Sequence, residues 1–326
     1  MLLLTGATGQ VGSALLPRLL AEGAQVRCLV RDPRRLGAQR VRVQIALGDL
    51  ADPPSFRNAM RGVDTVVHLA ASIRDQPRGS IEELNGIATW RMVRAAQRAG
   101  VERFVFFSVL GASTHHRARF FRAKALAEQA VNEAELRSTV FAPSIVYAPG
   151  DPWLTLLERM ALLPVMPVSG RGRATYEPIW AEDVADCVIA SLRAPSGETA
   201  NPIPGPFEEA DPPAAGAGIV AGTSHARYEL AGPQTLSHDE IIRLVLRSQH
   251  RNRPLLHIPT PLVSRGLRLL EATVGQRAFA TWDEAELMEV SMLSSRGVAD
   301  VESLGVTPQP MAAVLGPVEE RIATAM

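Results

Sequence analysis

Three glycines near the start of the chain have the spacing of a phosphate-binding turn. Gly6, Gly9 and Gly12 lie between an apolar run over residues 1–4 and an apolar stretch over residues 11–20, in the order strand, turn, helix. Because glycine has no Cβ, a pyrophosphate can approach the backbone there, and the N–H groups that begin a helix favour an anion. The pattern predicts a dinucleotide site, with an ordinary tight turn as the alternative. The residues expected to contact the dinucleotide at this turn are Gly6, Thr8, Gly9, Gln10, Val11 and Gly12.

Candidate residues for the adenosine half of the cofactor follow the next two strands. A strand predicted over residues 25–30 is followed by Arg31, whose guanidinium suits the 2′-phosphate of NADP(H), whereas an acidic residue there suits the free 2′-hydroxyl of NAD(H). We therefore expect NADP(H) as the preferred cofactor, with NAD(H) and an ordinary surface role for Arg31 as the alternatives. A strand over residues 41–46 leads into Asp49 and Leu50, and Asp49 is placed to accept a hydrogen bond from the adenine amino group.

Small and polar residues stand at the ends of the later strands. They are Leu69, Ala70 and Ala71 at and after the end of a strand over residues 64–69, Ser108 at the end of a strand over residues 101–108, and Pro143 in a strand over residues 139–146. Small side chains at such a strand end let a cofactor pass close to the sheet. His68 is interpreted as a hydrogen-bonded core histidine rather than a catalyst. Asn85 could support the active-site side of the sheet, and a solvated helix residue is the alternative.

The alternation of strands and helices predicts an α/β fold with a doubly wound parallel sheet (Rossmann) and a smaller C-terminal substrate-side subdomain. We assign residues 1–150 to the NAD(P)-binding domain and residues 151–326 mainly to the subdomain. Segments at about 174–192 and 226–232 are expected to return to the first domain. Residues 194–224 are rich in Pro, Gly and Ala, which predicts a mobile insertion.

Composition narrows the class of protein. The 326 residues are 46% hydrophobic and 21% charged, as is typical of a globular protein, and basic and acidic residues both total 34. This balance gives no support for nucleic-acid binding. No apolar run approaches the ~18 residues of a membrane span and the first strand begins at Met1, so we expect a cytoplasmic protein with no signal peptide and no integral membrane segment. Cys28 and Cys187 lack metal-ligand spacing and are expected to be reduced core residues, and no metal site is expected.

These motifs resemble those of the short-chain dehydrogenase/reductase superfamily, in its extended and atypical branches. The matching segments are residues 5–12, 48–50, 68–71, Asn85, 107–108, the helix around Lys124, 143–151, 182–185 and 304–308. Residues 108–112, 121–128 and 228–233 are most similar to the atypical group that includes the NAD(P)H-binding accessory subunit of respiratory complex I and its bacterial relatives. The resemblance implies a nicotinamide cofactor and leaves the substrate open.

The resemblance also implies a Tyr-x-x-x-Lys pair, in which the phenol acts as acid and base and the ammonium holds the nicotinamide ribose. Lys124 matches this lysine and is the one lysine beside 33 arginines, but the position four residues earlier is Phe120, which has no exchangeable proton. Ser108 stands one step before the usual serine or threonine. Lys124 and Ser108 are therefore the candidate catalytic residues, and Lys124 is also expected to bind the cofactor. Other candidate proton sources are His115 and His116, interpreted first as solvated loop residues, and Tyr147, interpreted first as a pocket residue.

Three functions remain open at this point. The first is an atypical NADP(H)-dependent reductase whose substrate needs little acid catalysis, such as a quinone or an activated alkene. The second is a non-catalytic NAD(P)H-binding sensor, assembly factor or accessory subunit, which would have a protein partner in place of a small-molecule substrate. The third is a sugar-nucleotide epimerase or dehydratase, which the missing tyrosine disfavours.

Overall fold

The computed structural model describes residues 1–194, 224–274 and 281–316. They belong to two compact units, of which unit 1 is residues 1–142 and 188–228 and unit 2 is residues 143–187 and 229–326. This division puts the first boundary after Ala142, whereas the sequence pattern placed it after residue 150. Residues 174–187 belong to unit 2 because their short strands pair with other strands of that unit. The expected insertion lies almost entirely outside the described residues.

Unit 1 is built on a parallel sheet of seven strands in the order β3-β2-β1-β4-β5-β6-β11. The strands are β1 (Leu2–Thr5), β2 (Val26–Val30), β3 (Gln44–Leu47), β4 (Thr65–His68), β5 (Arg103–Phe107), β6 (Arg137–Pro143) and β11 (His225–Leu230). The order reverses between β1 and β4, which makes the sheet doubly wound, and this confirms the predicted fold class. In such sheets a ligand binds beyond the carboxyl ends of the strands, at the point where the order reverses.

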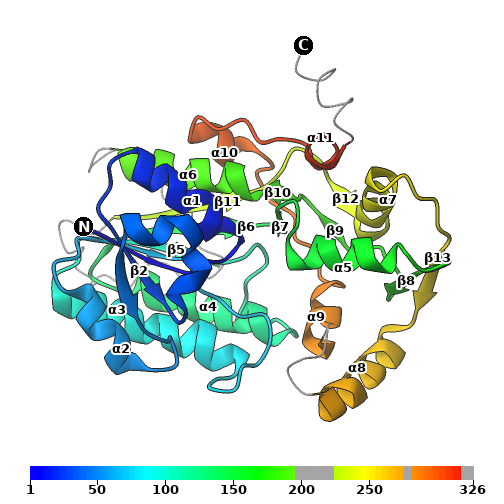
Figure 1. The fold of residues 1–326 in the computed structure, drawn as a ribbon, viewed down its shortest axis with the longest axis horizontal. Helices are drawn as coiled ribbons and strands as arrows, with labels where there is room; N and C mark the ends of the chain where they lie inside the picture. The colour runs from blue at the N-terminus through cyan, green and yellow to red at the C-terminus, as the bar shows by residue number, and fades with distance from the viewer. Residues whose placement is uncertain (195–223, 275–280, 317–326) are drawn as a thin grey trace, which may run out of the picture. The chain divides into compact units, whose positions relative to one another are not determined.

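Helices cover both faces of the sheet (Figure 1). Helix α1 (Gln10–Ala21) lies on one face, and α2 (Pro53–Arg57), α3 (Ala88–Ala99) and α4 (Arg119–Asn132) lie on the other. A single π-helical turn, η3 (Glu83–Ile87), leads into α3. Single π turns inside helices are rare and often stand at functional sites.

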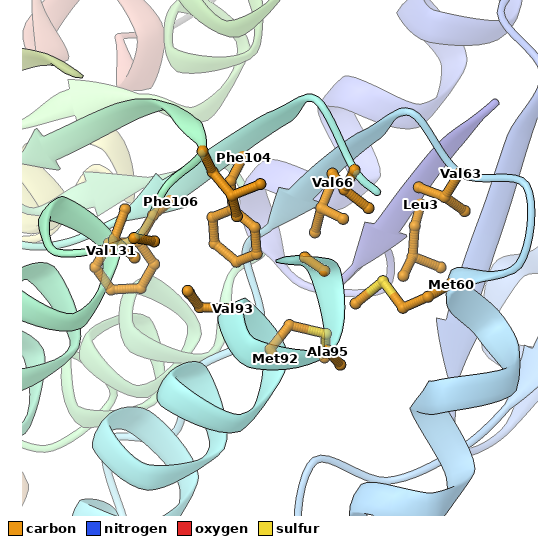
Figure 2. Packing of buried hydrophobic residues seen from close by; sticks show 14 of the residues in the cluster. Leu3, Met60, Val63, Val66, Met92, Val93, Ala95, Phe104, Phe106 and Val131 are labelled. Atoms are coloured by element: carbon orange, nitrogen blue, oxygen red, sulfur yellow. The ribbon is translucent and has the colours of Figure 1, made fainter. Parts of the chain in front are cut away.

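The core of unit 1 lies between the sheet and the second of these faces. Phe104 and Phe106 of β5 are completely buried and pack with Met92 and Val93 of α3 and Val131 of α4 (Figure 2). A side chain of this size stabilises the fold by about 1.5–3 kcal/mol when it is fully buried. The core therefore fixes β5 against α3 and α4, which carry several of the candidate site residues.

Two strand boundaries differ from those expected. Residues 33–42 form 3-10 turns (η1) rather than the start of β3, because Pro33 begins them and Gly37 adopts a positive φ of 56°. Strand β6 ends at Pro143, whereas the expected strand continued to residue 146; the continuation, β7 (Val146–Tyr147), pairs with β10 (Ile179–Trp180) instead. Proline has no N–H to donate to a ladder, so it ends the strand.

Unit 2 consists of short strands and helices. Its strand pairs are β7 with β10, β8 (Met166–Ser169) with β13 (Leu255–Ile258), and β9 (Thr175–Tyr176) with β12 (Leu236–Ser237). Its helices are α5 (Pro152–Met160), α7 (His238–Ser248), α8 (Thr260–Val274), α9 (Trp282–Leu287), α10 (Ala299–Ser303) and α11 (Met311–Leu315), and α6 (Ala181–Arg193) crosses into unit 1. Ser237 and Glu240 form the capping box expected at the start of α7.

Two absences hold for the part of the chain that the structure describes. None of its helices combines the length and the apolar character needed to cross a membrane. Nor do three or more of its His, Cys, Asp and Glu side chains converge on a place where they could hold a metal ion.

The glycine turn predicts how a single methyl group would affect the fold. A Cβ on Gly12 would lie 2.1 Å from the Gly6 carbonyl oxygen and 2.7 Å from Cα of Ala7, both backbone atoms that cannot rotate away. We expect Gly12→Ala to lower the free energy of unfolding by about 1–3 kcal/mol, as overpacking does. Gly266→Ala on α8 is the matched control, because its Cβ would meet nothing within 4 Å. Chemical denaturation of both variants makes the comparison, and equal stabilities would contradict the close approach.

Candidate functional site

The sequence-predicted site residues of unit 1 lie at the carboxyl edge of the sheet. Gly6 follows β1, Arg31 follows β2, Asp49 comes shortly after β3, Leu69 follows β4 and Ser108 follows β5. Pro143 is buried and is the last residue of β6, and the division of the chain assigns it to unit 2. Parallel strands end at one edge of their sheet, so residues far apart in the chain are brought to that edge.

The turn between β1 and α1 has the form that a phosphate-binding turn requires. Gly6 has φ +72°, and a Cβ there would lie 2.7 Å from the Ala70 nitrogen and 2.8 Å from the Leu69 carbonyl carbon. Helix α1 begins with Gly9 as its N-cap, no side chain caps its first N–H groups, and its first turn holds no acidic residue. These N–H groups and the positive end of the helix dipole are therefore available to an anion. The residues present fit a dinucleotide pyrophosphate.

The residues expected to bind the adenosine half of the cofactor are Arg31, which is exposed, and Asp49, which lies in a hydrogen-bonded loop after β3. Arg31 is exposed directly beyond β2, and the neighbouring Asp32 accepts from the Arg34 backbone N–H at 2.9 Å. The loop after β3 is fixed by Ser55, whose hydroxyl accepts from the Asp49 N–H at 3.0 Å. One oxygen of the Asp49 carboxylate accepts from the Ala51 N–H at 3.1 Å, and the side chain is partly exposed. A guanidinium and a carboxylate thus stand after neighbouring strands.

A buried chain of hydrogen bonds runs from the glycine turn to α3. The Thr5 hydroxyl accepts from the Ala70 N–H at 3.3 Å, so its own hydrogen is free to donate to Nδ1 of His68 at 2.8 Å. Nε2 of His68 then carries the ring proton and donates to the Thr89 hydroxyl at 3.1 Å, which donates to the Asn85 carbonyl oxygen at 2.6 Å. Burial lowers the pKa of His68 to about 3, and the nearby Lys124 charge contributes to that shift, so the ring is neutral. His68 is a core histidine and does not provide an acid.

Asn85 extends this chain to the segment after β4. Its side-chain amide donates to the Ser72 and Ile81 carbonyl oxygens, both at 2.7 Å, and its Oδ1 accepts from the Ser72 N–H at 3.1 Å. Asn85 is 1% exposed and lies within the π-helical turn. The segment over residues 69–72 is therefore held at one end by Thr5 and at the other by Asn85, and the solvated role considered for Asn85 is wrong.

Lys124 is buried beneath the carboxyl edge of the sheet. Its Nζ is on a side chain 3% exposed, donates to the Phe107 carbonyl oxygen at 2.6 Å, and lies 4.9 Å and 5.8 Å from the ring centres of Phe106 and Phe120. Burial lowers the pKa of Lys124 from 10.5 to about 7, and the Glu128 carboxylate opposes that shift. Phe120 occupies the position of the tyrosine in the Tyr-x-x-x-Lys pattern, and its ring can neither give nor take a proton.

Ser108 is directed at a buried carboxylate. Its hydroxyl donates to Oε2 of Glu128 at 2.5 Å, and Arg227 of β11 donates from Nε to Oε1 of the same carboxylate at 2.7 Å. Glu128 is 1% exposed and the Arg227 side chain is 12% exposed. Arg227 thus pairs with the negative charge of the carboxylate, and both carboxylate oxygens accept hydrogen bonds, as a buried charge requires.

Comparison with known proteins supplies the decisive observation for the family. Residues 6–195, more than half of the chain, match the family model described as NAD(P)H-binding. The chain belongs to the NAD(P)H-binding family. Within it, the chain is of the extended, atypical short-chain dehydrogenase/reductase type that its motifs resemble.

Three proteins illustrate what this family member is similar to. A ceramide reductase of Caulobacter vibrioides is 30% identical over 194 residues, which are 59% of this chain and 61% of that protein. The chain therefore spans less than two thirds of the length of this relative. Subunit 9 of the NADH dehydrogenase (ubiquinone) 1 alpha subcomplex of Mus musculus is 23% identical over 316 residues, 94% of this chain and 76% of that one. The solved UDP-glucose 4-epimerase of Thermus thermophilus, in complex with NAD, shares the fold with a TM-score of 0.67 and 17% identity, covering 100% of this chain and 99% of that one.

The other candidate proton sources in this NAD(P)H-binding protein are His115, His116 and Tyr147, and none of them is placed as a positioned acid in unit 1. The His116 ring stacks on the Phe121 ring with their centres 4.4 Å apart, and its Nδ1 accepts from the Ala118 N–H at 3.0 Å. Burial lowers the pKa of His116, and His115 is exposed. Tyr147 belongs to unit 2, is completely buried, and has a hydroxyl with no hydrogen-bond partner among the described residues. Burial raises the pKa of Tyr147, so the phenol is held neutral.

Two residues of this site were missed from the sequence. Glu128 stands four residues after Lys124, a spacing that puts both on one side of a helix, and this spacing could have indicated it. Arg227 follows Glu128 by 99 residues, and no spacing in a single sequence connects them.

The buried ammonium of Lys124 predicts a gain in stability when it is removed. Below pH 7 the lysine is protonated in both the folded and unfolded chain, so the folded state bears the full cost of burying the charge. Between pH 7 and about 10.5 the folded chain holds fewer protons, so wild-type stability rises with pH through this window. We expect Lys124→Met to be more stable by about 1–2 kcal/mol at pH 6 and to lose this advantage toward pH 10. Denaturation across pH measures it, and a variant less stable at every pH would contradict the burial cost.

Proposed function

We propose that the chain is an NADP(H)-dependent reductase whose substrate needs hydride transfer but little acid catalysis from the protein. A quinone or an activated alkene has this chemistry. The observation that carries the proposal is the arrangement of Lys124 and Phe120: the lysine is retained in a buried place where its charge costs stability, while the phenol four residues earlier is absent. A costly buried lysine is a reason to infer a role in binding or chemistry.

The cofactor preference rests on the end of β2. Arg31 is exposed there, where a guanidinium can pair with the 2′-phosphate of NADP(H) through two parallel hydrogen bonds. The first N–H groups of α1 would hold the pyrophosphate, and Asp49 would accept from the adenine amino group. When bound, the reduced nicotinamide supplies a hydride to the acceptor and becomes oxidised, and the anion formed on the acceptor takes one proton from water.

The residues beneath the carboxyl edge would hold and orient the nicotinamide end. Lys124 would donate to the nicotinamide ribose, because an ammonium has three N–H donors and Lys124 directs one of them to the Phe107 carbonyl oxygen. Ser108 would face the substrate with its hydroxyl hydrogen already given to Glu128, so its oxygen can accept but not readily donate. Without a positioned acid, the rate for an ordinary ketone falls by about 10²–10⁴-fold, which favours acceptors whose reduced form is stabilised without a proton.

A second function is supported by a different observation. One relative whose match covers 94% of this chain is a subunit of NADH dehydrogenase, which suggests an accessory role in which NADP(H) is bound without turnover and a protein partner replaces the substrate. The engagement of Ser108 with Glu128 is consistent with that role. A sugar-nucleotide epimerase is the third function, but the likeness to solved epimerases is one of fold and the phenol is absent.

Turnover separates these functions. We expect purified protein to oxidise NADPH with at least one acceptor in a panel of quinones and activated alkenes, and Lys124→Met to reduce kcat/KM by about 10-fold or more, because the ribose contact is lost. Arg91→Met, which removes an exposed cation from α3, is the control and should leave the rate unchanged. Spectrophotometry of NADPH oxidation makes the measurement. Tight NADPH binding with no oxidation above background would overturn the reductase and favour the accessory role.

A further inference from the structure

The carboxylate of Glu128, on α4, accepts hydrogen bonds from residues at the end of β5 and on β11. It accepts the Ser108 hydroxyl at 2.5 Å on one oxygen and Nε of Arg227 at 2.7 Å on the other. Lys124 stands one helical turn before it on α4, and its ammonium is attracted by the carboxylate. The end of β5, α4 and β11 therefore share one buried group.

We propose that Glu128 and Arg227 are a positioning pair, in which Glu128 keeps the Lys124 ammonium charged and fixes the Ser108 hydroxyl, and Arg227 limits how strongly it does so. This inference rests on the proposed function, because it concerns the lysine assigned to the cofactor. It adds β11, a strand about a hundred residues further along the chain, to the support of that site.

The signs of the Glu128 and Arg227 charges determine the direction in which each residue shifts the protonation of Lys124. A negative charge one helical turn from a buried ammonium favours the protonated lysine, whereas burial favours the neutral amine. Arg227 pairs with the other oxygen of the same carboxylate and offsets part of its field. Removing Glu128 should therefore make Lys124 easier to deprotonate, and removing Arg227 should make it harder.

Few other charged groups face Lys124 in the described part of the chain. His68 of β4 is close enough for the Lys124 charge to lower its pKa, and it is neutral near pH 7. Glu82, next to the π-helical turn that packs against α4, is engaged with Arg119 at 2.7 Å. Glu83 in the same turn accepts from the Ser80 N–H at 2.8 Å. Glu128 is therefore the carboxylate expected to set the charge of Lys124.

The single lysine makes the test direct. Labelling with ¹³C- and ¹⁵N-lysine gives one set of side-chain signals, and the dependence of the Cε and Nζ shifts on pH in the cofactor-free protein gives the titration midpoint of Lys124. We expect a midpoint near 7 in the wild type, about one pH unit lower in E128Q, and higher than wild type in R227M. E133Q makes the same chemical change at the exposed end of α4 and should leave the midpoint unchanged.

Binding provides the second measurement. Because the lysine ammonium donates to the ribose more strongly than the neutral amine does, E128Q should weaken NADPH binding by up to about 5–10-fold at pH 8 and by less than about twofold at pH 6. A merely structural role for Glu128 would weaken binding equally at both values. Where E128Q fails to fold, E128Q/R227M removes both charges and carries the test, with a midpoint between those of E128Q and wild type.

The outcomes distinguish the two proposals. A midpoint that does not move in E128Q, or that moves in the same direction in E128Q and R227M, overturns the positioning pair whether or not the protein binds NADPH. The expected pair of opposite shifts without any NADPH binding supports the positioning pair and counts against the proposed function.

Discussion

A lysine buried beneath the carboxyl edge of a parallel sheet is the constraint on which the proposed reduction depends. Removing an ammonium from water is expensive, and carbonyl, aromatic and carboxylate groups around it offset only part of that cost. Lys124 has all three: the Phe107 carbonyl oxygen at 2.6 Å, two phenylalanine rings at 4.9 Å and 5.8 Å, and Glu128 one helical turn away. Each of these groups belongs to β5 or α4, so the core that packs these elements together also holds the charge in place.

The same edge of the sheet is shaped by close backbone contacts. Gly6 and Gly12 allow the turn after β1 to pack against the segment after β4 and against itself at distances that no side chain permits. The hydrogen bonds from Thr5 through His68 and Thr89 to Asn85 then hold that segment in position. The glycine turn after β1 and a lysine on a distant helix are thus parts of one rigid framework, as precise binding of the proposed dinucleotide would require.

The sequence was most informative where local pattern decides the structure. The glycine spacing and the strand-helix alternation were sufficient to predict the doubly wound sheet, because periodicity and glycine geometry are local properties. The cofactor turn that the same glycines indicate stays a prediction. The sequence was less informative where the structure depends on contacts between segments far apart in the chain. The partnership of Arg227 with Glu128 depends on β11 joining the sheet beside β6, and the burial of Tyr147 in unit 2 depends on strand pairing within that unit. The end of β6 at Pro143 could have been foreseen, because proline cannot continue a ladder.

The most direct test of the central claim, that the carboxyl edge of unit 1 binds NADP(H), is a calorimetric titration of the wild-type protein and Arg31→Ala with NADPH and with NADH. We predict that the wild type binds NADPH about 10-fold or more tightly than NADH, and that Arg31→Ala loses this preference while it retains NADH binding, since a charge-assisted contact with a phosphate contributes roughly 1.5–3 kcal/mol. Failure of the wild-type protein to bind either nucleotide would contradict the claim.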